Sequence, residues 1–170
     1  KAMALPGITS TFRASLLVDR VRVRLQEDTK SVESLRAGLQ ELGEATRLLG
    51  PAQNEELRWS IIRGQIQLHE ELGEPQAAVH AIQRGLRAWQ HILSPTHRAD
   101  LRAELIPLLQ RRREDGRTDE AEAAHELDGL LVDAQTVPWD ALSRVCDAAW
   151  QWLYYHCLHA KHRKGRVRAA

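Results

Sequence analysis

Helix-breaking residues divide this chain into seven stretches, and this punctuation limits its possible folds more than any other feature. Gly, Pro or a Ser-Pro pair separates longer runs at positions 50–51, 73–75, 94–95, 116 and 138, and Asp28-Thr29 separates the first run from the second. A Gly often follows the last turn of a helix and a Pro fits the first turn of the next one. The runs between are rich in Leu, Ala, Arg, Glu and Gln, which favour helix over strand. We therefore expect an all-α fold.

The runs predict helices at about 10–27, 31–50, 53–72, 75–93, 96–114, 118–133 and 138–160, with Ser31 and Thr96 among the N-caps. Apolar residues at helical spacing are the core candidates: Leu35, Leu39, Leu42, Leu57, Ile61, Ile62, Ile66, Leu68, Leu101, Leu105, Leu108 and Leu109. The first helix differs, because its apolar residues cover two sides: Phe12, Leu16, Leu17, Val18, Val21, Val23 and Leu25. We expect that helix to be sandwiched between neighbours.

Two segments share a pattern at a fixed distance. Gly116 lies 43 residues after Gly73, and each glycine is followed by an alanine-rich helix. The same shift places Leu35 over Ala78 and Ala121. Helical hairpins that repeat in this way bury their apolar faces by stacking on one another. We expect one domain over 10–160, with hairpins at about 10–50, 53–93 and 97–134 and a capping helix at 138–160.

The segments LGEPQAAVHAIQRGL and DGRTDEAEAAHEL resemble the turn and second helix of tetratricopeptide (TPR) repeats. Gly73, Ala78 and Ile82 stand where that family has its turn glycine, small crossing residue and large apolar residue. The 43-residue period is similar to that of kinesin-light-chain-like repeats. The resemblance implies an α-solenoid whose first helices line a concave groove for a peptide or partner helix. Carried over by position, the groove residues are Arg20, Arg24, Glu27, Asp28, Ser60, Arg63, Gln67, Glu70, Glu71, Ala103, Ile106, Gln110, Arg113 and Glu114.

Arginine spacing in the first helix points independently to one charged side. Arg13, Arg20 and Arg24 are spaced so that they share a side at about 100° per residue, and Arg63 and Arg113 would extend it beside Gln67 and Gln110. Guanidinium forks and amides suit carboxylates, so the hypothesis is a ligand that is acidic or ends in a carboxylate. The alternative is a solvated face, or arginines paired with Glu70, Glu71 and Glu114.

The C-terminal region offers two further contact surfaces. Aromatic residues crowd the seventh expected helix and cannot all face one core: Trp150, Trp152, Tyr154 and Tyr155. A protein neighbour or a second copy of the chain is one explanation. Residues 161–170 carry five cations and no acid, and we expect a basic, flexible tail that could hold nucleic acid.

Nothing in the sequence indicates catalysis. His156, Cys157, His159 and His162 do not share one helix face, so we expect no metal, and we expect no cofactor either. No apolar run approaches the roughly 20 residues of a membrane span, no signal peptide is visible, and two cysteines make no disulfide framework. We expect residues 1–9 to be a cloning scar and leader before a domain of a larger cytoplasmic protein. The predicted function is a non-catalytic adaptor, scaffold or regulatory module that binds a protein or peptide. The alternatives are a nucleic-acid-associated domain and a dimerisation block.

Overall fold

The computed structural model describes residues 9–27, 29–50, 54–114 and 120–138, together with positions 143, 146, 147 and 150. Side chains are described for these residues except 110–114 and 120–123. The described residues form helices and turns without a strand, which confirms the all-α prediction. The chain divides into two compact units, residues 1–93 and 94–170. One continuous repeat domain over 10–160 stays a prediction.

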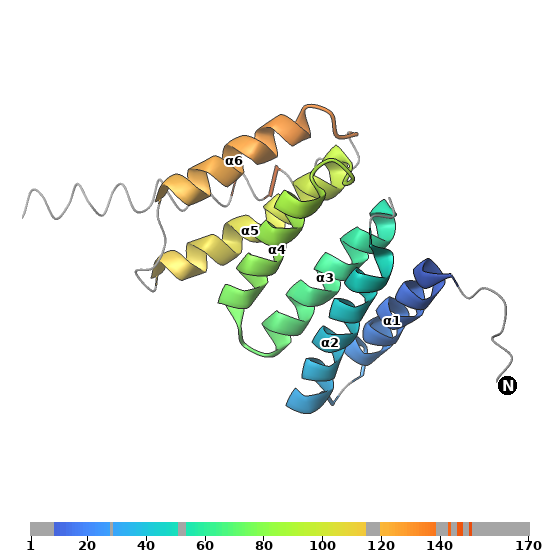
Figure 1. Ribbon diagram of the computed structural model, residues 1–170. Coiled ribbons are helices and arrows are strands. Elements are labelled where there is room, and N and C mark those ends of the chain that lie inside the picture. The colour runs from blue at the N-terminus through green and yellow to red at the C-terminus, as the bar shows by residue number, and fades with distance from the viewer. Residues whose placement is uncertain are drawn as a thin grey trace, which may run out of the picture. The chain divides into compact units, whose positions relative to one another are not determined.

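Unit 1 consists of four described helices that lie side by side (Figure 1): α1 (Ser10–Leu25), α2 (Val32–Leu49), α3 (Glu55–Glu71) and α4 (Pro75–Trp89). α1 packs on α2 and α3 packs on α4, while α3 also contacts both α1 and α2. The first three helices have side-chain N-caps, in which Thr9, Ser31 and Asn54 accept hydrogen bonds from backbone N–H groups of the first turn. The Ser31 cap is as predicted from the sequence.

The turn between α3 and α4 follows the predicted punctuation. Gly73 has a φ of 69°, in the left-handed region that side chains with a Cβ avoid. The N–H of Glu74 donates to the carbonyl of His69 at 2.8 Å and the N–H of Gly73 to that of Glu70 at 3.0 Å, which is a Schellman motif. Pro75 then takes the first turn of α4, where its missing N–H leaves no donor unpaired. The two breakers therefore reverse the chain within three residues.

The core of unit 1 lies where α3 meets the hairpin of α1 and α2. Leu42, Ile61 and Leu68 are fully buried there with smaller residues of α1 and α2. Burial of a leucine or isoleucine stabilises the fold by roughly 1.5–3 kcal/mol. The predicted core residues of α3 and α5 are all buried, which confirms the helical periodicity: Leu57, Ile61, Ile62, Ile66, Leu68, Leu101, Leu105, Leu108 and Leu109. Leu35 and Leu42 are buried as well, and Leu39 is half-buried at the edge of this core.

Arg58 is a cation inside unit 1, with only 3% of the residue exposed. Its Nη2 donates to the carbonyl of Gly50 at 2.7 Å, and its guanidinium carbon lies 4.8 Å from the centre of the Trp89 ring. Burial lowers the pKa of Arg58, but a guanidinium starts so high that it keeps its proton at neutral pH. The carbonyl end of α2 and the aromatic face at the end of α4 both favour a cation. Arg58 thus links the ends of two helices.

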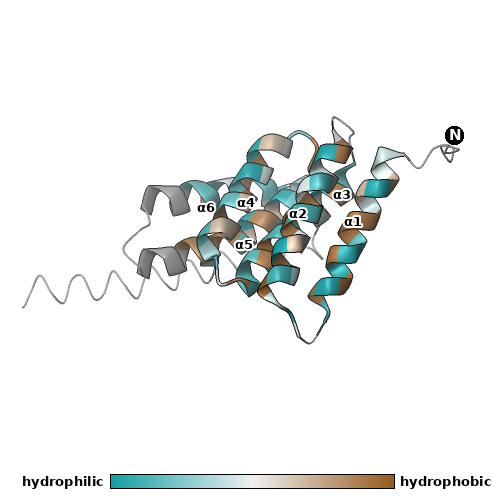
Figure 2. Ribbon diagram, turned by 60° about the horizontal axis from the view of Figure 1, so that its bottom comes forward, coloured by the Kyte–Doolittle hydropathy of each residue, from teal (hydrophilic) through white to brown (hydrophobic). Residues whose placement is uncertain are grey.

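α1 departs from the expected sandwich. Val18 and Val21 are buried, yet Phe12, Leu16 and Val23 are 53%, 47% and 62% exposed. Figure 2 shows apolar segments recurring along α1 between hydrophilic ones. The prediction that this helix is covered on two sides is therefore wrong for its outer side.

Unit 2 contains the described helices α5 (Pro95–Glu114) and α6 (Glu120–Ala134), which pack on one another. Ala99, Ile106, Leu130 and Val137 form its buried cluster. The predicted cap at Thr96 is wrong: Oγ of Ser94 accepts the N–H of His97 at 3.3 Å, because Pro95 fits the first turn and the helix begins there.

A buried ion cluster holds the two helices of unit 2 together. Asp133 is only 5% exposed and accepts from Arg98 Nε at 2.9 Å and Nη2 at 2.6 Å. Arg102 Nε donates to the other carboxylate oxygen at 3.4 Å. Two guanidinium groups on α5 therefore face Asp133 of α6, and Arg102 Nη1 also lies 3.7 Å from Glu126 Oε2 of the same helix.

Candidate functional site

A groove runs between α1 and α3 on unit 1. Its main hollow has a volume of about 670 Å³. A second hollow of about 530 Å³ lies toward the N-terminal ends of the two helices and shares Val18, Arg22 and Ser60 with the first. The two hollows therefore form one continuous surface. From Glu56 to Glu71 it follows α3 for about 22 Å, at 1.5 Å per residue.

The floor of the groove is apolar and its walls are polar. Val18, Val21 and Leu42 are the buried apolar residues of the main hollow, and Trp59 lines it half-buried. α3 supplies one wall through residues spaced three or four apart, which share a helix face: Ser60, Arg63, Gln67, Glu70 and Glu71. α1 supplies Arg22 and Gln26 from the opposite side. Such a combination can hold an apolar side chain while hydrogen-bonding the ligand around it.

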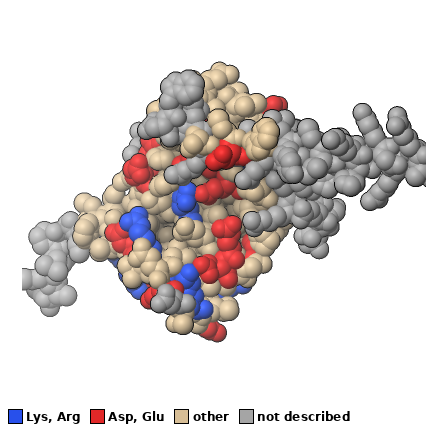
Figure 3. Space-filling model, turned by 180° about the vertical axis from the view of Figure 1, so that it is seen from behind, with Lys and Arg blue, Asp and Glu red and all other residues tan. Residues whose placement is uncertain are grey.

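The charges in the groove alternate along its length. Arg22 and Arg63 lie in its middle part, whereas Glu70 and Glu71 line the end near the α3–α4 turn. The guanidinium carbon of Arg63 lies 5.4 Å from the centre of the Trp59 ring, which holds the cation over an aromatic face. Lys30 Nζ contacts Glu71 Oε1 at 2.6 Å, and Arg22 Nη1 contacts Asp19 Oδ1 at 3.4 Å. Figure 3 likewise shows acidic and basic side chains interspersed over the face it presents.

The residues that family resemblance and arginine spacing predicted for α3 do line this groove. Arg63 and Gln67 are both there, together with Ser60, Glu70 and Glu71. Sequence reasoning missed Trp59, Arg22 and Gln26. Trp59 lies four residues before Arg63, and this spacing could have suggested an aromatic–cation pair on one helix face.

The predicted arginines of α1 lie outside the groove. Arg24 Nη1 contacts Glu41 Oε2 of α2 at 2.8 Å, and Arg20 Nη2 contacts Glu41 Oε1 at 2.8 Å. Arg13 is exposed on the same side of the helix, so the three arginines share a face as predicted. That face borders α2, while the groove borders α3. Periodicity gives the relative positions of residues on a helix but not the neighbour that each face meets.

The predicted groove residues of the third hairpin belong to unit 2. Ile106 is fully buried in the cluster of unit 2, and half-buried Ala103 packs against that cluster. Ile106 is therefore a core residue, and its proposed place in a binding groove was wrong because the family alignment gave no information on its burial. The side chains of Gln110, Arg113 and Glu114 lie outside the described residues, as does Asp28 of unit 1. Glu27 is exposed and lines neither hollow of the groove.

The second predicted contact surface is described at one of its four aromatic residues. Trp150 is 69% exposed. Trp152, Tyr154 and Tyr155 lie outside the described residues, together with the basic segment 161–170 and the histidines at 156, 159 and 162. Cys146 is described and exposed.

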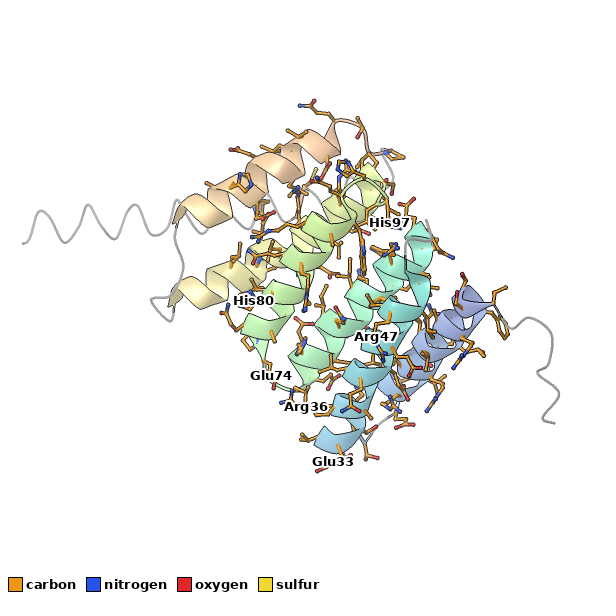
Figure 4. All side chains as sticks on the ribbon, in the orientation of Figure 1. Glu33, Arg36, Arg47, Glu74, His80 and His97 are labelled. Atoms are coloured by element: carbon orange, nitrogen blue, oxygen red, sulfur yellow. The ribbon has the colours of Figure 1, made fainter. Side chains whose placement is uncertain are left out.

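A polar cluster that the sequence did not predict joins α2 to the α3–α4 turn. Arg36 and Glu74 point toward one another (Figure 4) and form an ion pair. Nδ1 of His69 lies 3.0 Å from the other carboxylate oxygen of Glu74. The hydrogen bond from His69 and the nearby Arg36 guanidinium lower the pKa of the Glu74 carboxyl below its ordinary value. The cluster links α2 to the α3–α4 turn, which lies at one end of the groove.

In the described part of the chain, no three His, Cys, Asp or Glu side chains come together in a way that could hold a metal ion. Each described helix is too short or too polar to cross a membrane. Comparison with protein-family models, with curated proteins and with solved structures found no match for this chain.

Proposed function

We propose that unit 1 is a non-catalytic interaction module that binds a peptide segment with a central acidic residue, from a partner protein, in the groove between α1 and α3. The observation that carries the proposal is a long open hollow with an apolar floor and two guanidinium groups in its middle part. A hollow of this size accepts an apolar anchor, and arginine forks bind carboxylates in a defined orientation.

The dimensions and charges define the ligand further. About 22 Å along α3 corresponds to about seven residues of extended chain. A carboxylate near the middle of the peptide would face Arg22 and Arg63. A cation at one end would face Glu70 and Glu71. The proposed ligand is therefore a short segment with an apolar anchor, a central acid and a terminal base.

The TPR-like resemblance supports the same assignment and remains part of the proposal. In such arrays the first helix of each hairpin lines the concave side, and α1 and α3 are the first helices of the two expected hairpins of unit 1. The proposed role is an adaptor, scaffold or regulatory module that recognises its partner through this groove.

Selection of random peptides on the intact chain, followed by affinity measurements, tests the proposal. Ser60→Trp places a large side chain in the groove. Gln40→Trp adds the same side chain at an exposed position of α2 that does not line the groove. We expect selected peptides to carry an Asp or Glu near the middle of the segment, and to lose at least about tenfold in affinity to the Ser60→Trp variant. The Gln40→Trp variant should bind them as the unmodified chain does.

Arg63→Gln tests the contribution of the Arg63 charge to binding separately from that of the apolar floor. It should reduce the preference for acidic over neutral peptides while the apolar anchor still binds. A selection that yields no peptide sensitive to Ser60→Trp would rule out the groove as the binding site.

A further inference from the structure

The exposed apolar residues of α1 form one stripe, which we call the outer stripe: Phe12, Leu16 and Val23, with Asp19 between them. Their spacing of four, three and four residues keeps all of them on one helix face. The apolar members are about half exposed or more, so the stripe is on the surface. It lies on the opposite side of α1 from buried Ala14 and Val21.

α3 carries a stripe with the same spacing at the same place in the helix. The N-caps Thr9 and Asn54 are 45 residues apart, and this shift converts the outer stripe of α1 into Leu57, Ile61, Gly64 and Leu68 of α3. In α3 the stripe is buried against α1 and α2. A Cβ added at Gly64 would lie 2.9 Å from Leu42 of α2 and 3.8 Å from Val21 of α1. This stripe is therefore where α3 receives the preceding helical hairpin.

The comparison indicates what kind of surface covers the outer stripe. On α3 the equivalent residues are covered by helices that present valine, leucine and alanine side chains. α1 has Asp19 where α3 has Gly64, so a helix packed on α1 approaches less closely and meets a carboxylate at the centre. The outer stripe thus suits a helix with an apolar face that carries a polar residue opposite Asp19.

The charges beside the stripe indicate the sign of the charge that the partner carries there. Arg13 and Arg20 lie on one flank and Arg22 on the other, all of them exposed. Arg20 shares the carboxylate of Glu41 with Arg24, and Arg22 shares that of Asp19 only over an exposed 3.4 Å contact. Within the described residues, the four arginines Arg13, Arg20, Arg22 and Arg24 therefore have only two carboxylates beside them, those of Asp19 and Glu41, so the flanks of the stripe keep a net positive charge. An antiparallel second copy would bring the Arg13 and Arg20 flank against itself, which disfavours self-association.

We propose that the outer stripe of α1 is a second interaction surface, which binds an amphipathic helix of a partner whose apolar face is bordered by acidic residues. The surface is distinct from the groove: α1 uses Val18, Val21 and Arg22 toward α3 and Phe12, Leu16 and Val23 on its outer side. Phe12 and Asp19 lie where the two surfaces meet, at the N-terminal hollow of the groove, whereas Leu16 and Val23 line neither hollow. A helix on the stripe would extend the row of helices that begins with α1.

A designed helical peptide of about 16 residues tests the proposal, because that length matches α1. In this glutamate peptide the residues of the binding face repeat the four-three-four spacing of the stripe, and the positions on either side of that face are glutamate. The control, or lysine peptide, has lysine instead of glutamate at those positions. Binding to the intact chain is measured by fluorescence anisotropy at low salt. We expect the glutamate peptide to bind at least about tenfold more tightly than the lysine peptide, and added salt to reduce the difference.

Variants of the chain locate the binding site. Leu16→Ser combined with Val23→Ser removes apolar side chains that are already exposed, and circular dichroism verifies the fold. This pair of substitutions should weaken binding of the glutamate peptide at least about tenfold, and Arg13→Glu should weaken its binding several-fold. Arg47→Glu reverses an exposed charge of α2 away from the stripe, and Gln67→Trp fills the main hollow of the groove, which no residue of the stripe lines. Both variants should bind the peptide normally.

Three results would overturn the proposal. The first is glutamate-peptide binding that survives the Leu16→Ser and Val23→Ser pair. The second is equal binding of the lysine peptide. The third is a dimer in solution that these two substitutions dissociate, which would make a second copy the occupant of the stripe.

Discussion

Arg24 of α1 and Glu41 of α2 are joined by two hydrogen bonds, with Nη1–Oε2 at 2.8 Å and Nη2–Oε1 at 3.3 Å. Their side chains are 17% and 14% exposed, so the pair is largely shielded from water. Gly38 of α2 makes room for it, since a Cβ there would lie 3.3 Å from Arg24 Nη1. An arginine that resembled a ligand-binding residue in the sequence therefore holds two helices together.

Replacement of Glu41 by Gln should destabilise unit 1. The substitution keeps the shape of the side chain but leaves Arg24 without its counter-charge in a partly buried place. We expect the free energy of unfolding to fall by about 1–3 kcal/mol, as for other hydrogen bonds to charged groups. Native-state hydrogen exchange of α1 and α2 amides measures the change. Asp19→Asn is the control, because the Asp19–Arg22 pair is more than half exposed and is expected to contribute less than about 0.5 kcal/mol. Equal effects of the two substitutions would contradict this interpretation.

Much of the helical framework could be predicted because breakers and caps act locally. Gly73 and Pro75 determine the α3–α4 turn through their own backbone restrictions, so no tertiary information was needed. The cap of α5 was misplaced by two residues because Ser94-Pro95 can either end a helix or begin one.

The binding surfaces were harder to predict, because they depend on which helix faces which. The sequence suggested Arg20, Arg24 and Arg63 as ligand-binding residues. Glu41 of α2 forms ion pairs with the first two, and of these three arginines only Arg63 lines the groove. Glu41 is 17 residues from Arg24, and no helical periodicity connects positions on different helices. The exposed outer side of α1 was missed for the same reason.

Two glycine-to-alanine substitutions should have opposite effects. A Cβ on Gly85 would lie 2.5 Å from Cδ1 and 2.8 Å from Cγ1 of Ile62, so α3 and α4 would have to move apart. Gly43 has nothing within 4 Å of such a Cβ. Alanine favours helix over glycine by about 1 kcal/mol. We expect Gly43→Ala to stabilise unit 1 by up to about 1 kcal/mol, and Gly85→Ala to destabilise it by about 1–2 kcal/mol because overpacking outweighs the helix preference. Denaturant titration of both variants measures the difference, and a stabilising Gly85→Ala would show that this helix contact is loose.

The Glu74 cluster should make unit 1 sensitive to acid. Because His69 and Arg36 lower the pKa of Glu74 in the folded chain, the carboxylate contributes stability above its ordinary pKa of 4.5. That contribution is lost as the pH falls through the lowered folded-state value. We expect Glu74→Gln to be less stable than the unmodified chain near pH 7, and the difference to shrink as the pH falls through the lowered folded-state pKa of Glu74. Thermal unfolding across this range measures both. Glu33→Gln, on the exposed start of α2, is the control, and a gap that stays constant down to pH 3 would contradict the assignment.

Asp133 should have the corresponding role in unit 2. Its buried carboxylate receives Arg98 and Arg102 from α5, so Asp133→Asn leaves two guanidinium groups facing a neutral amide. Loss of one partner from a buried ion cluster typically costs about 3–5 kcal/mol. We expect amides of α5 and α6 to lose exchange protection by about that amount, while those of α1 to α4 keep theirs if the two compact units unfold separately. Asp128→Asn removes an exposed carboxylate of the same helix and should change protection by less than about 0.5 kcal/mol. Equal loss of protection in both units after Asp133→Asn would show that they unfold as one cooperative body.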